Sequence, residues 1–435
     1  MAFFLLVLVN AALFIRPSEI IPDLEAIPIY NLLISSCFLL AFPAVQRELT
    51  RRSLVETPIS VCVLGLLPAV VLSHLSHFQR GYAQDAGISF LKVLVYYLLI
   101  VAVLDSPGRL SRFLNWLAVM IGVVTLLALL HYHGIMTVAH MNVMERDDVD
   151  PATGQIITVL QLFGTGIFAD PNDLCLMLTI GIGLSLYRIG DRRSALRGLW
   201  LVALVGFAYA LYLTRSRGGF LAMLGCIVTY CLARFGWKKA IPVTVLVVPL
   251  MFVLFAGRST NLNTSSGTGQ GRIQYWGMAV PWFRGSPVFG IGAGMLPDAI
   301  GKEAHNSYVS GYAELGFVGG TLFLGVYAAT FWGLFQLGRF EDQIQDPELR
   351  RIRPYLLAMA GGYAVGMLSL TRNYINPTYL IPGLAAAYLR LAAADARVPV
   401  PLPRCDGWHV KRLVVLSAAS LLAIYGYIRL FARFG

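Results

Sequence analysis

Long apolar runs, each of roughly 17 to 22 residues, recur along the whole chain and constrain its fold more than any other feature. A helix rises 1.5 Å per residue, so a run of about 20 residues crosses the ~30 Å hydrocarbon core of a bilayer. Hydrophobic residues make up 57% of the 435 residues and charged residues only 13%, whereas soluble proteins carry about a quarter charged residues. The sequence therefore predicts an all-α integral membrane protein, built as a bundle of transmembrane helices.

The candidate spans follow one another from end to end of the chain. They lie near residues 2–15, 28–45, 58–75, 87–104, 113–133, 172–188, 198–214, 218–234, 240–256, 307–337, 355–371, 376–393 and 412–430. We expect about 12 transmembrane helices in one polytopic domain over residues 1–435, with the first run retained because it lacks a small-residue cleavage site. The run 307–337 is too long for one simple crossing and contains Gly311, Gly316, Gly319 and Gly320, so we expect it to begin above the membrane or to bend within it.

Positive charges gather in alternate loops, which the positive-inside rule assigns to the cytoplasm. The residues that carry them are Arg47, Arg51, Arg52, Arg109, Arg112, Arg192, Arg193, Arg197, Arg234, Lys238, Lys239, Arg350, Arg351 and Arg353. The long loops 134–171 and 257–306 then face the periplasm, together with the turns 215–217 and 372–376. Twelve and thirteen spans both remain open, because a thirteenth would put Arg433 outside. The net charge of +11 follows from this topology and does not indicate nucleic-acid binding.

The first outward-facing motif is the turn Thr214-Arg215-Ser216-Arg217-Gly218-Gly219. An arginine pair followed by two glycines allows guanidinium groups and backbone amides to converge on an anion. The alternative is an interfacial anchor that contacts lipid phosphates. We favour a pyrophosphate site, because the positive-inside rule does not account for arginine anchors on the outer side of the membrane.

The second motif group lies in the loop 257–306, which we expect to be partly helical and folded as a lid, because long ordered loops are usually functional. The loop is rich in Gly, Pro and aromatic residues and ends at His305. Polar residues follow His305 at the entry to a helix that carries Glu314. A histidine that titrates near neutral pH suits a general base, whereas a lone outward histidine is more often structural.

These motifs together carry a family resemblance. In chain order they are Arg215-Ser216-Arg217-Gly218-Gly219, Gly271-Arg272-Ile273-Gln274-Tyr275-Trp276, Gly290-Ile291-Gly292-Ala293-Gly294 and His305-Asn306-Ser307-Tyr308 with Glu314-Leu315-Gly316. Over residues 200–335 the array resembles the catalytic core of the O-antigen ligases and O-antigen polymerases. Phe168-Ala169-Asp170-Pro171-Asn172-Asp173 is similar to a segment upstream of that core in some members. The resemblance implies a GT-C type, metal-independent, inverting glycosyltransferase in the bacterial inner membrane.

The resemblance also implies roles for individual residues. The family's essential arginines, which hold the diphosphate of an undecaprenyl-pyrophosphate-linked glycan and offset its charge as it leaves, are matched by Arg215 or Arg217 and by Arg272, and we expect all three to bind the diphosphate. His305 matches the family's essential histidine, which orients or deprotonates the acceptor hydroxyl. The residues expected to support them are Asn306, Tyr308 and Tyr275. No cofactor and no metal ion are expected, because the arginines supply the positive charge that a divalent cation supplies in other enzymes.

The acceptor is the point on which related functions differ. We expect transfer of O-antigen polysaccharide to the lipid A core, with the active site facing the periplasm and membrane lipids around the bundle. Transfer to another glycan, as in a polymerase, or to a protein uses the same donor and stays open. A transporter of lipid-linked sugars is the alternative of another class. Such proteins favour ionisable residues at mid-membrane and repeated halves, and the sequence shows neither beyond Lys92 near the outer end of a span.

One acidic stretch points to the competing metal-dependent chemistry. Asp148-Val149-Asp150, preceded by Asp147, has the spacing of a metal-binding DxD sequence. Runs of carboxylates are usually solvated turns, and we favour that interpretation. The cysteines suggest neither a disulfide nor a metal cluster, because most lie inside apolar runs and Cys405 is alone in a cytoplasmic segment.

Overall fold

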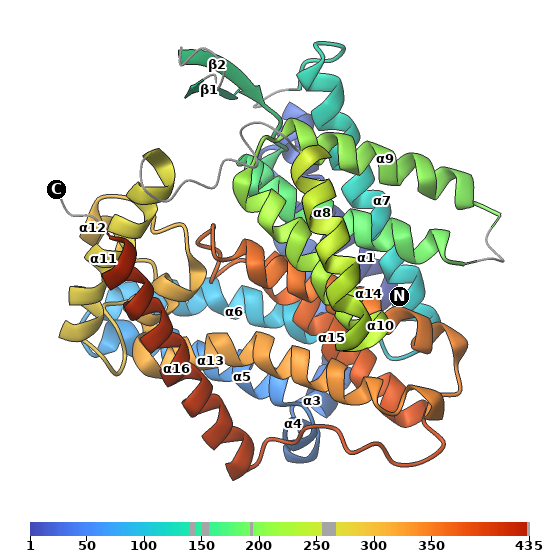
Figure 1. The fold of residues 1–435 in the computed structure, drawn as a ribbon. Helices are drawn as coiled ribbons and strands as arrows, with labels where there is room; N and C mark the ends of the chain where they lie inside the picture. Colours follow the sequence, from blue (N-terminus) through green and yellow to red (C-terminus); the bar gives the residue numbers. More distant parts are fainter. Residues whose placement is uncertain (139–143, 150–155, 192–194, 255–266, 433–435) are drawn as a thin grey trace. The chain divides into compact units, whose positions relative to one another are not determined.

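The computed structural model describes residues 1–138, 144–149, 156–191, 195–254 and 267–432 (Figure 1). The chain forms two compact units, which are described one at a time. Unit 1 comprises Met1–Ala41, Val103–Asn261 and Asp346–Gly366, and unit 2 comprises Phe42–Ala102, Leu262–Gln345 and Met367–Gly435. Each unit is therefore assembled from segments far apart in the sequence.

Unit 1 is mainly helical. Its helices are α1 (Ala2–Phe14), α2 (Pro17–Ile20), the 3₁₀ helix η1 (Pro22–Leu24), most of α3 (Ile29–Glu48), α7 (Pro107–Tyr132), η2 (Gly166–Phe168), α8 (Pro171–Ile189), α9 (Arg197–Leu213), α10 (Arg217–Leu254) and α14 (Pro347–Gly366). Small residues let α10 and α14 pack closely, since a Cβ at Gly225 would lie 2.7 Å from Val365. Such contacts suit helix association in a membrane, where hydrophobicity alone does not drive it.

Unit 2 is helical in all its described regular structure. Its elements are α4 (Arg51–Glu56), α5 (Pro58–Leu75), α6 (Arg80–Val103), α11 (Gly267–Gly285), α12 (Leu296–Ile300), α13 (Ser307–Gly338), η4 (Glu341–Gln343), α15 (Asn376–Asp395) and α16 (Gly407–Phe431). Helix α13 packs along α5, and α11 packs against both α13 and α16 (Figure 1). The loop before α13 thus contains helices α11 and α12, as a partly helical lid requires.

The described helices confirm the expectation of a multi-pass membrane protein. Eight of them are long and apolar enough to cross a membrane by length and composition, and α1 and α9 are shorter apolar helices. Leu39 on α3 and Leu422 on α16 are 73% and 71% exposed. Apolar surface of this kind needs an apolar environment, at about 25 cal/mol per Å² removed from water. The full count of about twelve spans stays a prediction.

Two long helices break at glycines. In α10 the break falls at Gly236, between the two spans expected at 218–234 and 240–256. In α13 it falls at Gly316, with φ 65° and ψ −165°, so the run 307–337 is not one straight helix, and which of its two parts crosses the membrane stays a prediction. A Cβ at Gly316 would lie 2.3 Å from the carbonyl of Val288. Glycine is therefore required here both by its backbone conformation and by the chain packed against it.

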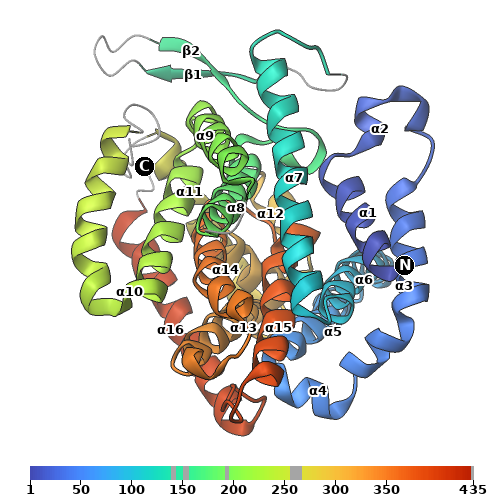
Figure 2. The ribbon, with the colours of Figure 1, turned by 90° about the vertical axis from the view of Figure 1, so that its right-hand side faces the viewer.

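A two-stranded antiparallel hairpin adds to the predicted helices. Strand β1 (Met144–Val149) pairs with β2 (Ile156–Gln161), with Met144 opposite Gln161 and Val149 opposite Ile156 (Figure 2). The second strand is rich in β-branched residues, which favour extended backbone. The run is too short to span a membrane, so hydropathy gave no indication of the hairpin.

Candidate active site

In unit 2, His305 has an unusual backbone conformation immediately before a helix. Its φ is 50°, in the left-handed region that only four described non-glycine residues adopt, at a cost of roughly 1–2 kcal/mol. The next residue, Asn306, caps α13, because its Oδ1 accepts hydrogen bonds from the amides of Tyr308 and Val309 at 3.0 and 3.2 Å. His305 thus lies at the amino-terminal end of α13, in a conformation that must be held by its neighbours.

The residue before His305 is fixed to α11. The indole Nε1 of Trp276 donates a hydrogen bond of 2.8 Å to the carbonyl of Ala304. Arg272 lies four residues before Trp276 and so shares its face of the helix. Tyr275 contacts the same segment two residues earlier, with the Lys302 ammonium 5.8 Å from its ring centre. The structure therefore brings the helix carrying Arg272 and Tyr275 against the segment that ends at His305.

On its other side, the start of α13 is bonded to the loop between α14 and α15. The amide of Ser307 donates to the Met367 carbonyl at 2.9 Å, and its hydroxyl donates to the Leu370 carbonyl at 2.7 Å. The same hydroxyl accepts the amide of Arg372 at 2.9 Å. Arg372 thereby lies beside the residue two positions after His305. Sequence reasoning placed Arg372 in an outward turn but gave it no role, although its position in such a turn was the available signal.

Glu314 anchors the glycine-rich segment of the lid. Its side chain is 1% exposed, and it accepts hydrogen bonds from the Leu296 amide at 3.3 Å and the Tyr374 hydroxyl at 2.7 Å. Burial and the adjacent Glu314 carboxylate raise the pKa of Tyr374 well above its ordinary value. Tyr374 therefore remains a protonated donor, and Glu314 is a structural acceptor that ties the lid to the α14–α15 loop.

The glycine-rich segment 290–294, called the brace below, is fixed by hydrogen bonds to the protein and does not form a phosphate-binding loop. The amides of Ile291 and Gly292 donate to backbone carbonyls of α13 at 3.1 Å each, and the Ala293 amide donates to the Ser73 hydroxyl at 3.1 Å. A phosphate-binding loop needs amides that are available to the ligand. Here three successive amides already have protein partners.

Two histidines of α5 and the turn after it hold the brace from the other side. His77 Nε2 lies 2.9 Å from the Gly290 carbonyl and His74 Nε2 lies 3.2 Å from the Ala293 carbonyl. Each imidazole can donate a proton there in the appropriate tautomer. These histidines were not among the predicted site residues, and their contacts assign them to support of the lid.

In unit 1, the turn Thr214–Gly219 is joined to the start of α8. The Ser216 hydroxyl donates to Asn172 Oδ1 at 2.5 Å and accepts the Gly219 amide at 2.9 Å. Asn172 is in turn held by Asp170, which accepts its side-chain amide at 2.7 Å. Arg215 lies within this arrangement with φ 48°, in the same strained region as His305. The Phe168–Asp173 segment and the arginine turn therefore form one structural feature.

The electrostatics of this turn favour an anion. Arg217 is the first residue of α10, where the helix dipole is positive, and Arg215 is two residues earlier. Cationic side chains are unfavourable at that end of a helix, whereas phosphate groups are favoured. Both arginines are half-buried, so bulk water screens their charge only in part. The carboxylates of Asp170 and Asp173 lie beside the same turn and offset part of this charge, so a diphosphate site here stays a prediction.

The structure thus groups the predicted residues into two sets. His305, Asn306, Tyr308, Arg272 and Tyr275 lie in unit 2, whereas Arg215 and Arg217 lie in unit 1. A single site that includes both sets stays a prediction.

The candidate metal sequence falls only in part on described residues. Asp147 and Asp148 lie in strand β1, and Asp150 lies outside the residues that the structure describes. Within the described chain, no three His, Cys, Asp or Glu residues are grouped so that they could hold a metal ion.

Comparison with known proteins agrees with the resemblance found in the sequence. No curated protein matches the chain. Residues 202–324 match the family model described as O-antigen ligase. This stretch contains the arginine turn, α11, the glycine-rich brace and His305. Over residues 202–324 the chain is therefore similar to the O-antigen ligase family.

Proposed function

We propose that the protein transfers a glycan from undecaprenyl pyrophosphate to the lipid A core oligosaccharide, on the periplasmic face of the bacterial inner membrane. In this proposal the chain is one polytopic domain of about twelve spans of GT-C type, with its catalytic core at residues 200–335. The family match supports O-antigen ligase or polymerase activity in general. The donor, the acceptor and the periplasmic site are our inference.

The observation that carries the proposal is the way in which His305 is held. A left-handed histidine is bounded on one side by Ala304, which Trp276 binds, and on the other by Asn306 and Ser307, which cap and anchor α13. Strained residues held in this way cluster at functional sites. A histidine needed only for packing gains nothing from such a conformation.

The chemistry follows from the groups present. The acceptor hydroxyl oxygen forms a bond to the anomeric carbon of the donor sugar while the bond from that carbon to the diphosphate oxygen breaks. His305 takes the hydroxyl proton, and undecaprenyl pyrophosphate leaves with the bonding electron pair. A single displacement of this kind inverts the anomeric configuration. Arg215, Arg217 and Arg272 stabilise the negative charge of the leaving diphosphate, so no metal ion is required.

Arg372 is a further candidate for this charge stabilisation. Its backbone amide donates to the Ser307 hydroxyl, so Arg372 lies at the start of α13 close to His305, and a guanidinium there can bind a phosphate through its forked donors. We include it among the residues that hold the donor.

The proposal is tested with the purified full chain in detergent. A synthetic undecaprenyl-pyrophosphate-linked repeat unit is offered with lipid A core, with a second glycan unit, or with a candidate protein, each in the presence and absence of excess chelator. We expect a glycosylated lipid A core of inverted anomeric configuration, with or without chelator. Elongated glycan in place of it would identify a polymerase, and activity lost on chelation would disprove metal independence. No transfer to any acceptor would overturn the proposal.

A further inference from the structure

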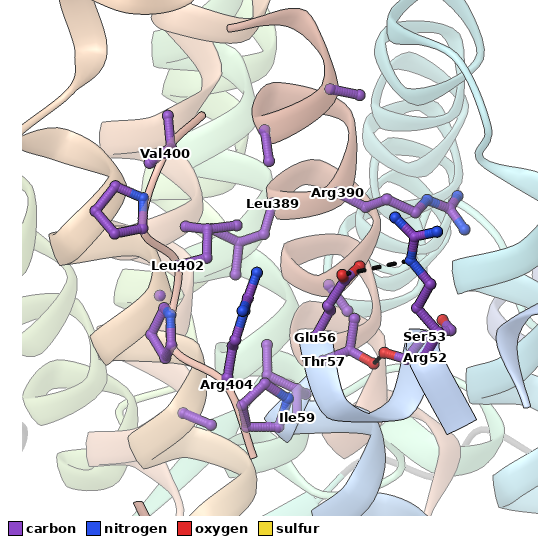
Figure 3. Close-up of a pocket in the computed structure, with 18 of the residues that line it drawn as sticks. Arg52, Ser53, Glu56, Thr57, Ile59, Leu389, Arg390, Val400, Leu402 and Arg404 are labelled. Atoms are coloured by element: carbon purple, nitrogen blue, oxygen red, sulfur yellow. Dashed lines mark hydrogen bonds and ion pairs between the residues drawn. The ribbon is translucent and has the colours of Figure 1, made fainter. Parts of the chain in front are cut away.

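A second site lies within unit 2, at the helix ends opposite the lid along α5 and α13. A cavity of about 860 Å³ opens there between the start of α5, the later turns of α13 and α15, and the segment 399–404. Figure 3 shows Arg52, Glu56, Arg404, Leu389 and Leu402 among the residues that line it. A cavity of this size is typical of small-molecule sites.

The mouth of this cavity carries uncompensated positive charge. Arg52 faces Glu56 at 3.7 Å, but this pair is exposed and therefore weak. Arg404 is exposed, and its guanidinium has no carboxylate within ion-pair distance in the described part of the chain. Arg51 lines an adjoining hollow with Arg52 and Arg404. Three arginines and one glutamate thus line this hollow, and forked guanidinium donors match a phosphate.

Arg390 contributes differently from the arginines at the mouth. It forms an ion pair with Glu48 and donates a hydrogen bond of 2.8 Å to the Val101 carbonyl. Its charge is already balanced by a protein carboxylate. We therefore assign the anion-binding capacity to Arg52 and Arg404.

An apolar groove continues from the cavity. It has a volume of about 310 Å³ and shares Pro58 and Ala329 with the arginine-lined cavity. Its walls come from α5, α13 and α16, and include Trp332, Leu413 and Leu416. Leu416 is 46% exposed, so the groove opens on the side that a membrane-spanning helix presents to lipid. Together the two hollows suit one amphiphilic ligand, whose anionic head would contact the arginines and whose apolar tail would lie in the groove.

We infer that this pair of hollows binds an anionic phospholipid, with its phosphate between Arg52 and Arg404 and an acyl chain beside Leu413. The positive-inside rule assigns the loop of Arg51 and Arg52 to the cytoplasm, where the leaflet is rich in anionic lipids and basic pockets between helices bind their headgroups. A free phosphate compound does not account for the apolar groove. The site is independent of glycan transfer and of the residues proposed for it.

Native mass spectrometry of the detergent-solubilised full chain tests this inference. The protein is titrated with dioleoyl phosphatidylglycerol and, separately, with dioleoyl phosphatidylcholine. We expect the wild type to retain phosphatidylglycerol about tenfold more strongly, as expected from hydrogen bonds to charged groups. The double variant Arg52→Gln/Arg404→Gln should bind both lipids alike. The control Lys238→Gln/Lys239→Gln removes the same charge from another loop that the rule places on the same side, and it should keep the preference.

A further variant tests the contribution of the apolar groove separately from that of the arginines. Ala329→Phe places a ring where the two hollows meet. It should weaken the binding of both lipids while leaving the ratio of their affinities unchanged. Its thermal unfolding midpoint is measured in parallel, so that a misfolded variant is recognised and replaced by the smaller Ala329→Val. Equal retention of the two lipids by the wild type would overturn the inference. Displacement of phosphatidylglycerol by an equal concentration of glycerol phosphate would reassign the site to a soluble phosphate.

Discussion

The hydroxyl of Tyr374 donates a hydrogen bond of 2.7 Å to the buried Oε2 of Glu314, across 60 residues of sequence. This bond joins the loop after α14 to the broken helix α13. The other carboxylate oxygen, Oε1, accepts the amide of Leu296, so Glu314 holds together three segments around His305.

Removing the Tyr374 hydroxyl should destabilise the protein. Tyr374→Phe leaves a buried carboxylate oxygen without its donor, at a cost of about 1–3 kcal/mol, and we expect a lower thermal unfolding midpoint with reduced glycan transfer. Tyr82→Phe is the control, because Tyr82 is 57% exposed. An unchanged midpoint in Tyr374→Phe would show that the bond contributes nothing to stability.

Alanine substitutions at two glycines of the brace should distinguish the stability cost of backbone strain from the cost of a steric clash. Gly290 and Gly294 have φ of 73° and 77°, but a Cβ at Gly290 would lie 2.3 Å from the Glu314 carbonyl group, whereas one at Gly294 meets nothing within 4 Å. Gly294→Ala should therefore lose only the strain of a left-handed alanine, about 1–2 kcal/mol. Gly290→Ala should lose more stability and most of the transfer activity. Equal unfolding midpoints for the two variants would contradict this account of the brace.

The sequence predicted the helices well, because a membrane span is specified by length and apolarity within one continuous segment. Pro58–Leu75 begins and ends at the predicted residues, and a bend in the run 307–337 was one of the two alternatives expected from its length and its glycines. The hairpin at Met144–Gln161 was not predicted, because pairing between two short strands is non-local. Apolar residues outside the predicted spans gave no further indication of the fold.

The site was predicted in its residue types but not in its contacts. The His305 motif and the arginine turn were recognised from their position in outward loops. The role of Arg372 was missed because it depends on Ser307, 65 residues away. The link from Ser216 to Asn172 is equally non-local, although the sequence had singled out both segments. Hydrogen bonds between distant segments are properties of the fold, which local patterns do not contain.

The topology gives a labelling prediction. Lys302 and Asp342 are exposed residues before and after α13, so one crossing separates them. With Cys405 replaced by Ser, a cysteine at Lys302 should react with a membrane-impermeant maleimide in intact spheroplasts, and a cysteine at Asp342 should react only after lysis. The reverse pattern would invert the topology and exclude a periplasmic site.

The arginines should respond to substitution by lysine if they clamp a diphosphate. Lysine keeps the charge but loses the two-pronged fork, so Arg217→Lys, Arg272→Lys and Arg372→Lys should each lower the transfer rate by about tenfold or more, from one lost charged hydrogen bond. Arg284→Lys is the control on α11, since Arg284 bonds the Tyr425 hydroxyl and has no role in the proposal. Full activity in all three variants would remove the clamp and favour simple lipid anchoring.

His305 provides the most direct test, because its backbone and its imidazole have separable effects. His305→Gly relieves the left-handed strain, so its unfolding midpoint should equal or exceed that of the wild type, while the transfer rate falls by about a hundredfold to ten-thousandfold as the general base is lost. His305→Gln retains a hydrogen-bonding group but cannot take a proton near neutral pH, and it should be nearly as slow as His305→Gly. Donor affinity, measured by titration with undecaprenyl pyrophosphate, should change little in either variant, because the arginines hold the diphosphate. A His305→Gln variant that transfers glycan at close to the wild-type rate would show that the imidazole only orients the acceptor. Weaker donor binding together with a lower unfolding midpoint would instead assign His305 to the support of the lid.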